Sequence, residues 1–366
     1  MLLFYKCCYM RRLGYIILIM ASVLLSSCSD GMGDRLPRSV GGTSEVLFIT
    51  QNKEQWEGAM GQAVRDFFEK EQYGLPQPEK NFDVVNLEVS AFSEMFQKHR
   101  NLIVGAINKD LDKVLVETQD DWKSAPQFVM RITAPDVDSW VKVFNMQAET
   151  LKEKFDENER ERFMTFFRPN VSPANAKAVN NAFGISMLVP DGFFVAVNKD
   201  KFMWLRRETD DMSMGLLIYE TPYRDTSDLN PQHLVAVRDS VVKKYVPGPL
   251  DGTYMTTDKK YVYPVFEVLP DFPAGYAVEM RGLWNVVGDF MGGPFVSYTI
   301  VNPEQDRLLT IEGFVYYPNK EKRDELRKLE SVIYSARYPD SEVLDDSDKT
   351  VDADDSNPDV KDDDLQ

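Results

Sequence analysis

Residues 276–317, with the sequence YAVEMRGLWNVVGDFMGGPFVSYTIVNPEQDRLLTIEGFVYY, decide the fold of the second half of the chain. Three apolar runs follow one another, Tyr276–Trp284, Phe295–Val301 and Leu308–Tyr317, and turn-forming residues separate them. The first two runs partly alternate between apolar and polar residues, as strands do when an antiparallel sheet buries one face. This stretch therefore predicts consecutive antiparallel strands.

Helices and further strands surround these three runs. Short apolar runs and a helix at Leu229–Tyr245 precede them, and Lys320–Ala336 forms a last helix with apolar residues at helical spacing. The first half alternates strands with helices, of which Asp136–Phe167 is the longest. We therefore expect an α+β protein with mixed or antiparallel sheets flanked by helices, in two α/β lobes of similar size, 44–180 and 181–340.

The amino terminus has the features of a secretion signal. Basic residues precede the apolar segment Leu13–Leu25, which is too short to span a bilayer core of about 30 Å. The sequence LSSC, ending at Cys28, then places small residues directly before a cysteine, as the lipobox of bacterial lipoproteins does. We expect residues 1–27 to be a signal peptide and Cys28 to carry the lipid.

Cysteine use and charge narrow the class of protein. The other two cysteines, Cys7 and Cys8, lie within the signal, so no disulfide, cysteine metal site or cysteine nucleophile is expected. The net charge of −17 disfavours nucleic acid and anionic lipid headgroups as partners, which leaves the lipid as the membrane attachment. Residues 28–43, rich in Ser, Gly and Asp, predict a flexible tether, and the acidic residues 341–366 predict a disordered tail.

Several short segments along the chain are distinctive. They are GLPQP at 74–78, HRN at 99–101, APQ at 125–127, ITAP at 132–135, WLR at 204–206, MRGLW at 280–284, FMGGPFVSY at 290–298, and GFV at 313–315 before Lys322 and Arg323. In these segments, from about Leu36 to Tyr338, the chain resembles uncharacterised lipoproteins of Bacteroidota-type bacteria that contain domain of unknown function 4837. This resemblance implies a lipobox, a cell-envelope location and a mixed α/β body, and it implies no catalytic residue.

Residues that could perform chemistry are few. Only two histidines occur, His99 and His233, and the chain lacks the HExxH, GxSxG and phosphate-binding loop motifs. We therefore expect no metal site and no cofactor. Two carboxylates, Glu279 and Glu312, lie within apolar strands, and each either serves a catalytic site or simply faces solvent or an arginine.

The FMGGPF peptide at 290–295 is the most distinctive segment. Two glycines followed by a proline predict a sharp turn, with a positive φ at Gly292 or Gly293. The peptide is either a structural hairpin loop or a binding loop. The candidate binding-loop residues are Trp284, Phe290, Met291, Gly292, Gly293, Pro294 and Phe295.

Three functions fit these observations. The first is a membrane-anchored envelope lipoprotein that is not an enzyme and binds a protein partner, as an assembly factor does. The second is a glycan- or small-ligand-binding module, which needs an aromatic-lined cavity. The third is a carboxylate-dependent hydrolase, which needs two acidic groups facing one cleft. We expect an outer-membrane lipoprotein that faces the periplasm, with surface display as the alternative.

Overall fold

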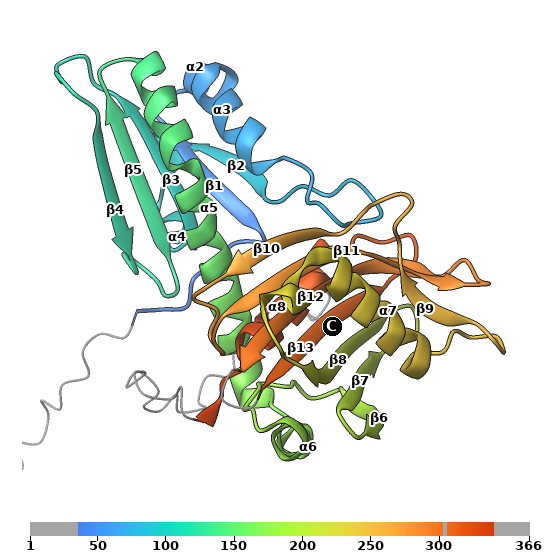
Figure 1. Ribbon diagram of the computed structural model, residues 1–366. Coiled ribbons are helices and arrows are strands. Elements are labelled where there is room, and N and C mark those ends of the chain that lie inside the picture. Colours follow the sequence, from blue (N-terminus) through green and yellow to red (C-terminus); the bar gives the residue numbers. More distant parts are fainter. Residues whose placement is uncertain (1–35, 303–305, 340–366) are drawn as a thin grey trace, which may run out of the picture.

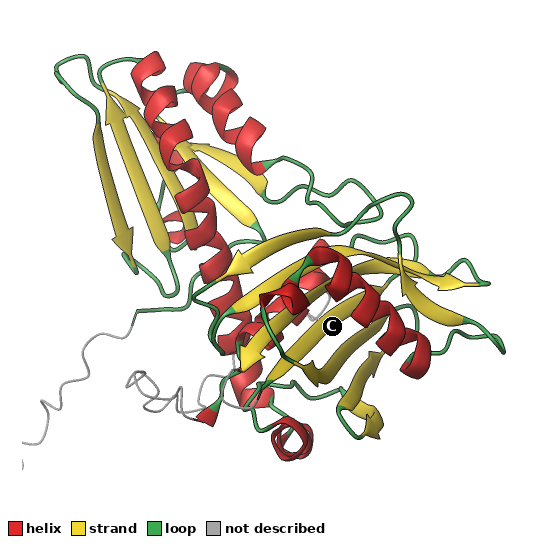
Figure 2. Cartoon of the chain, viewed as in Figure 1, coloured by secondary structure: helices red, strands yellow, loops and turns green. Residues whose placement is uncertain are grey.

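The computed structural model describes residues 36–302 and 306–339, which form an α+β protein with two sheets, as predicted (Figure 1; Figure 2). The expected signal peptide, Cys28 and the acidic tail at 341–366 lie outside the described residues. Within the described residues, no helix is both long enough and apolar enough to cross a bilayer.

The first sheet has five strands, four of them parallel. Continuous apolar runs such as EVLFIT form its centre, because strands covered on both faces need no polar alternation. The edge strand β4 runs antiparallel to β5. The spatial order is β2 (Asp83–Glu88), β1 (Glu45–Thr50), β3 (Asn101–Ile107), β5 (Phe128–Ala134) and β4 (Leu115–Asp120).

Helices cover both faces of this sheet. On one face α3 (Ala59–Phe68) and α5 (Val137–Phe167) bury an aromatic core. Gly58 separates α3 from the short helix α2 (Lys53–Glu57). A smaller cluster that includes Phe92, Phe96 and Trp122 packs on the other face, around η1 (Val89–Ala91) and α4 (Glu94–Gln97).

Helix α5 belongs to both halves of the molecule (Figure 2). Its first turns place Trp140, Phe144 and Phe155 in the core of the first sheet, whereas Phe163 and Phe167 enter the core of the second. Phe166, between them, is exposed on the surface of the helix. One continuous helix therefore connects the two hydrophobic cores.

The second sheet is antiparallel throughout, as the opening stretch predicts. The three expected strands are β11, β12 and β13, and β9 (Tyr254–Thr257) pairs with the far end of β11. The spatial order is β10 (Val265–Leu269), β11 (Ala277–Val287), β12 (Gly292–Asn302), β13 (Arg307–Tyr316), β8 (Ser213–Pro222), β7 (Phe202–Glu208) and β6 (Phe194–Lys199).

Different helices cover the two faces of this sheet. Helix α8 (Arg323–Tyr334), α6 (Pro173–Phe183) and the end of α5 pack on one face. Helix α7 (Pro231–Tyr245) packs on the other (Figure 1). The short 3₁₀ turns η2 (Arg168–Asn170) and η3 (Thr226–Leu229) precede α6 and α7 respectively.

Two expected boundaries differ from the structure. The lobe boundary at 180/181 falls inside α6, whose Val179 and Phe183 are buried in the C-terminal core. The expected tether over 28–43 is ordered in its last residues, because Ser39 and Val40 donate backbone hydrogen bonds to Ala125 and Lys98 at 3.1 and 3.0 Å. Residues 28–35 lie outside the described residues.

Candidate functional site: a cavity between the two domains

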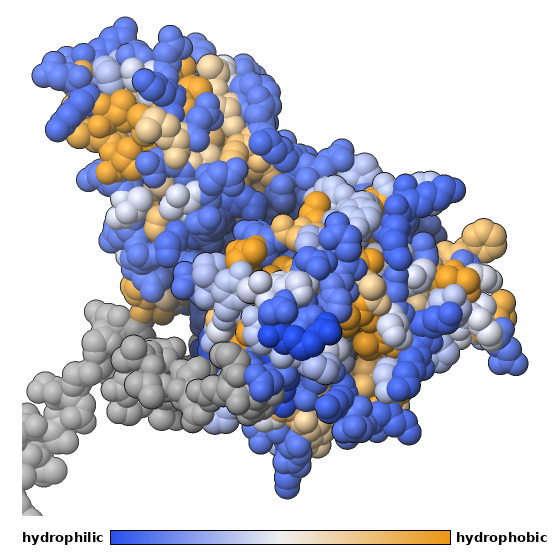
Figure 3. All heavy atoms as spheres, in the orientation of Figure 1, coloured by the Kyte–Doolittle hydropathy of each residue, from blue (hydrophilic) through white to orange (hydrophobic). Residues whose placement is uncertain are grey.

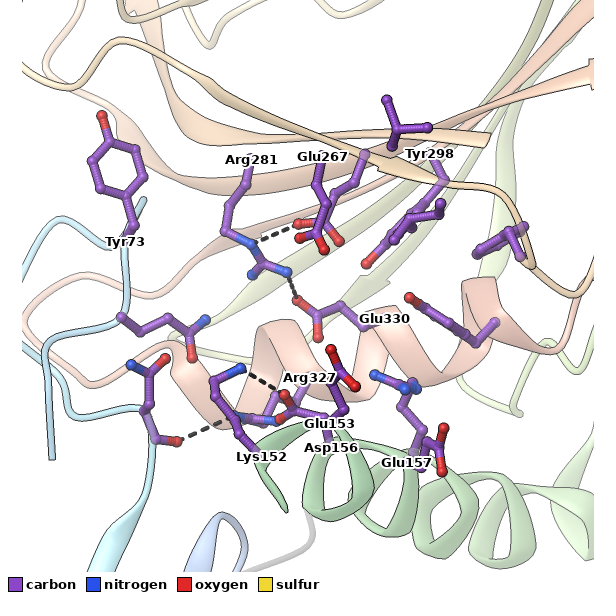
Figure 4. A pocket seen from close by; sticks show the side chains of 18 of the residues that line it. Tyr73, Lys152, Glu153, Asp156, Glu157, Glu267, Arg281, Tyr298, Arg327 and Glu330 are labelled. Atoms are coloured by element: carbon purple, nitrogen blue, oxygen red, sulfur yellow. Dashed lines mark hydrogen bonds and ion pairs between the residues drawn. The ribbon is translucent and has the colours of Figure 1, made fainter. Parts of the chain in front are cut away.

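A cavity of about 700 Å³ lies between the two domains (Figure 4). Helix α5 forms one wall, strands β10 to β12 form the opposite wall, and α8 lies between them. Residues 71–73, after α3, contribute to the rim. Cavities at domain interfaces are common places for small-ligand sites.

The linker between α3 and β2 fixes the distance between the domains. Gly74, with φ +81°, lies so close to the C-terminal sheet that an added Cβ would come within 3.1 Å of Arg281 Cγ. The buried Glu79 carboxylate accepts hydrogen bonds from the backbone N–H groups of Lys322 and Arg323, at 2.9 and 2.7 Å. A carboxylate at this position stabilises the positive end of the α8 dipole. The first domain therefore caps a helix of the second.

An ion-pair network joins α5 to α8 at the base of the cavity. The Asp156 carboxylate accepts hydrogen bonds from Lys152 and Arg327, each at 2.7 Å. Burial alone would raise the pKa of Asp156, but Arg327, Lys152 and Arg160 outweigh it and hold that pKa well below its usual range. Asp156 is therefore ionised at neutral pH and bonded across the domain interface.

The sheet contributes a second network. The Arg281 guanidinium lies between the carboxylates of Glu279, at 3.0 Å, and Glu330, at 2.6 Å (Figure 4). Burial would lower the pKa of Arg281, but these two carboxylates raise it well above its usual value. Glu267 pairs with Glu279 in the register of β10 and β11, and burial together with the Glu279 charge raises the pKa of Glu267.

Three aromatic rings form the end of the cavity. Phe272 stacks on Tyr298 at 5.2 Å between centroids, and Tyr334 contacts both rings edge-on, at 4.9 and 5.3 Å. Tyr298 is only 1% exposed, and its hydroxyl has no hydrogen-bond partner among the described residues. Burial raises the pKa of Tyr298 well above its usual value and that of Tyr334 to about 12, so both hydroxyls keep their protons at neutral pH.

The two carboxylates expected as site candidates lie in different environments. Glu279 lines the cavity, whereas Glu312 is fully buried on the opposite face of the sheet, under α7. There Glu312 accepts hydrogen bonds from Arg238 at 2.8 and 2.7 Å, and burial raises the pKa of Glu312 in spite of this pair. Glu279 and Glu312 therefore cannot act on one substrate.

The GGP peptide is part of a strand and not of a turn, contrary to the expectation. Gly292 and Gly293 open β12, and the positive φ of the hairpin belongs to Gly288. Both glycines are required for close approach, because an added Cβ on Gly293 would lie 2.0 Å from the Val315 carbonyl oxygen and one on Gly292 would lie 2.8 Å from that of Trp284. Pro294 follows in β12, opposite Leu283 of β11.

The candidate binding-loop residues divide between core and surface. Trp284 and Phe295 are buried under α7, and Met291 is half-buried beside them. Phe290 is fully exposed at the hairpin tip, next to a shallow groove of about 480 Å³ that Tyr261 also lines. Figure 3 shows hydrophobic side chains projecting at this end of the C-terminal domain.

The histidines do not lie in the cavity. His99 is buried in the first domain, where its Nε2 lies 2.7 Å from Glu45 and its ring fills the space beside Gly41. His233 follows the α7 N-cap residue Asn230, whose side chain accepts from its backbone N–H. Within residues 36–302 and 306–339, no group of three or more His, Cys, Asp or Glu side chains could hold a metal ion.

Comparison with known families divides the chain at the end of α5. Residues 172–335 match the family model of domain of unknown function DUF4837. This match confirms the predicted family. Residues 39–168 match a different model, domain of unknown function DUF8532, so the single resemblance expected over residues 36–338 covers two families. The GLPQP, HRN, APQ and ITAP segments lie in the DUF8532 part.

Other comparisons add little. No curated protein matches the chain. Among solved structures, the Saccharomyces cerevisiae Ran-binding protein Mog1p is similar at 13% identity and a TM-score of 0.28, over 42% of this chain and 90% of that one. A point mutant of the protein Mog1 gives 14% identity and a TM-score of 0.27 over the same shares. Scores this low support no inference about function.

Proposed function

We propose that this protein is a lipid-anchored envelope protein that binds a small polar ligand in the inter-domain cavity and does not transform it. The observation that carries the proposal is Tyr298, whose side chain is only 1% exposed and turned to the cavity, and whose hydroxyl makes no hydrogen bond to the described residues. Buried polar groups are nearly always hydrogen-bonded, so this hydroxyl is suited to a ligand. The charged groups around it are held in place by ion pairs, which provides a preorganised site.

The proposal includes a lipid anchor on Cys28 and a location at the outer membrane. Lipidation of Cys28 would attach the chain to the outer membrane on its periplasmic side, and residues 28–35 would form the tether. A Cys28→Ala variant should leave the membrane fraction and lose incorporation of labelled fatty acid. Protease treatment of intact cells distinguishes the two faces, because a periplasmic protein stays intact and a surface-displayed one is cleaved.

A thermal-shift screen tests ligand binding. The full chain in detergent is screened with small amines, neutral sugars and organic acids, and hits are repeated with Tyr298→Phe. The matched control is Tyr219→Phe, which removes a hydroxyl that bonds Thr310 in the core under α7. We expect at least one hit that stabilises the wild type and the control more than Tyr298→Phe. Equal stabilisation of all three proteins by every hit would contradict the proposal.

The hydrolase alternative has a specific site to test. Glu267 and Glu279 lie side by side on neighbouring strands, and Glu279 is paired with Arg281 while the pKa of Glu267 is raised. A general acid and an ionised carboxylate share such an arrangement in glycosidases. Mass spectrometry after incubation with envelope glycans decides between the two functions. Glycan cleavage by the wild type that is lost in Glu267→Gln would show that the protein is a hydrolase.

A second candidate function is protein binding through the β11–β12 hairpin. Phe290 is fully exposed at the tip of a hairpin whose strands belong to a rigid sheet, and Tyr261 beside it is 76% exposed. Exposed aromatic residues are frequent anchors of protein interfaces. A Phe290→Ser variant should lose a partner cross-linked in envelopes, whereas Leu250→Ser, at another exposed position, should keep it. Equal recovery with both variants would exclude the hairpin.

A further inference from the structure

We infer that the ligand of the inter-domain cavity is an organic cation with a primary amine, of the kind a free polyamine provides. This inference rests on the proposed binding function and names its ligand class. It follows from three features of the cavity. Carboxylates are in excess, three of the four cationic side chains are already paired with carboxylates, and the hydroxyl of Tyr298, on the aromatic wall, makes no hydrogen bond to the described residues.

The charge of the lining favours a cation. Eight carboxylates line the cavity, against four cationic side chains, which gives a net charge of −4 at neutral pH. The carboxylates are Glu71, Glu153, Asp156, Glu157, Glu267, Asp271, Glu279 and Glu330, and the cationic side chains are Lys152, Arg160, Arg281 and Arg327. A cavity with an excess of one sign of charge attracts ions of the opposite sign.

Three of the four cationic side chains already have carboxylate partners within the cavity. Lys152 and Arg327 both bond Asp156, and Arg281 bridges Glu279 and Glu330. The fourth, Arg160, lies over the ring of Tyr334. An anionic ligand that bonds Lys152, Arg281 or Arg327 would have to break one of these buried pairs, and breaking a buried pair is strongly unfavourable. An ammonium group meets no such barrier, because it can add to carboxylates that are not fully neutralised.

Glu267 is the carboxylate best placed to receive the ammonium group. It forms no ion pair among the described residues, and it lies directly across the strand register from Glu279. Arg281 bonds Glu279 at 3.0 Å, and the Glu279 charge still contributes to the raised pKa of Glu267. A cation between Glu267 and Glu279 would reduce the repulsion between the two carboxylates and would favour the ionised form of Glu267.

The aromatic wall supplies the remaining contacts. The Tyr298 oxygen can accept a hydrogen bond from an ammonium N–H, which a quaternary ammonium could not donate. The ring of Tyr334 already carries the Arg160 guanidinium at 4.2 Å from its centroid, which shows that this wall accommodates positive charge. Phe272 and the Tyr298 ring offer apolar contact to the alkyl chain of the ligand.

Calorimetric titration of the full chain with spermidine tests the inference. We expect saturable binding at the wild-type protein, and a dissociation constant at least about 10-fold higher for Glu267→Gln and for Tyr298→Phe. The matched control is Glu149→Gln, an exposed carboxylate on α5 outside the cavity, which should bind as the wild type does. Tetramethylammonium should bind at least about 10-fold more weakly than spermidine.

The outcomes separate this inference from the function on which it rests. A neutral sugar or organic acid that binds in a Tyr298-dependent manner, with no binding of spermidine, overturns the cation class and leaves the binding function standing. Spermidine binding that Glu149→Gln weakens as much as Glu267→Gln shows non-specific association with an acidic surface and also overturns the inference. Absence of any Tyr298-dependent ligand overturns both proposals.

Discussion

Two arginine–carboxylate pairs on opposite faces of the C-terminal sheet show how differently the same chemistry is used. Under α7, Arg238 and Glu312 are completely buried. On the other face, Arg281 holds Glu279 and Glu330 at the wall of a cavity, and these side chains keep some exposure. The first pair is closed off by a helix and a core, whereas the second borders the space between two domains. The covering element, and not the strand sequence, decides which carboxylate can meet a ligand.

We expect the largest loss of stability when the buried Arg238–Glu312 pair is broken. Glu312→Leu leaves the Arg238 guanidinium buried without its counter-ion, and we expect the free energy of unfolding to fall by about 3–5 kcal/mol. Chemical denaturation of the variant and the wild type measures this difference in the free energy of unfolding. The double variant Arg238→Met/Glu312→Leu should recover most of the loss, because it removes both charges together. A single variant as stable as the wild type would show that this pair is not sealed from solvent.

The next effect concerns the network between the domains. Asp156→Asn removes the carboxylate that holds Lys152 and Arg327, and we expect a loss of about 2 kcal/mol at neutral pH. Because the folded-state pKa of Asp156 is lowered, its contribution is complete above the unfolded pKa of about 3.9 and disappears as the pH falls through the folded value. Melting curves of the two proteins should therefore converge in acid. A difference that stays constant down to strongly acidic pH would contradict this assignment.

We expect smaller losses of stability when a tyrosine hydroxyl is removed from either face of the C-terminal sheet. Tyr298→Phe should change the free energy of unfolding by less than about 1 kcal/mol, since this hydroxyl makes no hydrogen bond to the described residues. Tyr219→Phe should cost about 1 kcal/mol, because it loses the bond to Thr310. Thermal unfolding of both variants provides the comparison. A greater loss at Tyr298 than at Tyr219 would mean that the cavity hydroxyl is structural.

The smallest effect lies at the hairpin tip. The Phe290 side chain is fully exposed, so Phe290→Ser should shift the melting temperature by less than about 2 °C. Gly293→Ala in the same hairpin should be clearly destabilising, because its new Cβ meets the Val315 carbonyl oxygen. Differential scanning calorimetry of the two variants compares their melting temperatures. Equal shifts would show that the tip is packed in solution.

Much of the fold is predictable from the sequence, because apolar runs and helical spacing are local signals. Strands β1 and β3 coincide with the continuous apolar runs EVLFIT and NLIVGAI, and α5 begins one residue after the expected start because Asp136 is its N-cap. The sequence does not predict strand β4, since its residues LVETQD are all exposed and carry no core signal. Helix α6, rich in Ala and Asn, also lacks a clear apolar period.

The cavity is not predictable in the same way. Its side chains come from α5, β10 to β12, α8 and the loop after α3, which are far apart in the sequence. Glu153, Asp156 and Glu157 have the pattern of a solvated face on a long charged helix, and Tyr298 has that of an ordinary core residue of a strand. Of the cavity residues, only Glu279 is a candidate from the sequence. The GLPQP, MRGLW and Lys322-Arg323 segments indicate the family, and their meeting at the domain interface is visible only in three dimensions.

The comparison of the two faces is tested most directly by nuclear magnetic resonance of the full chain with ¹³C-labelled tyrosine rings, titrated with spermidine. We expect the resonances of Tyr298 and Tyr334 to shift with a common saturation curve, while that of Tyr219, beside the sealed Arg238–Glu312 pair, stays in place. An unmoved Tyr298, or a Tyr219 that shifts as much as Tyr298, would contradict it.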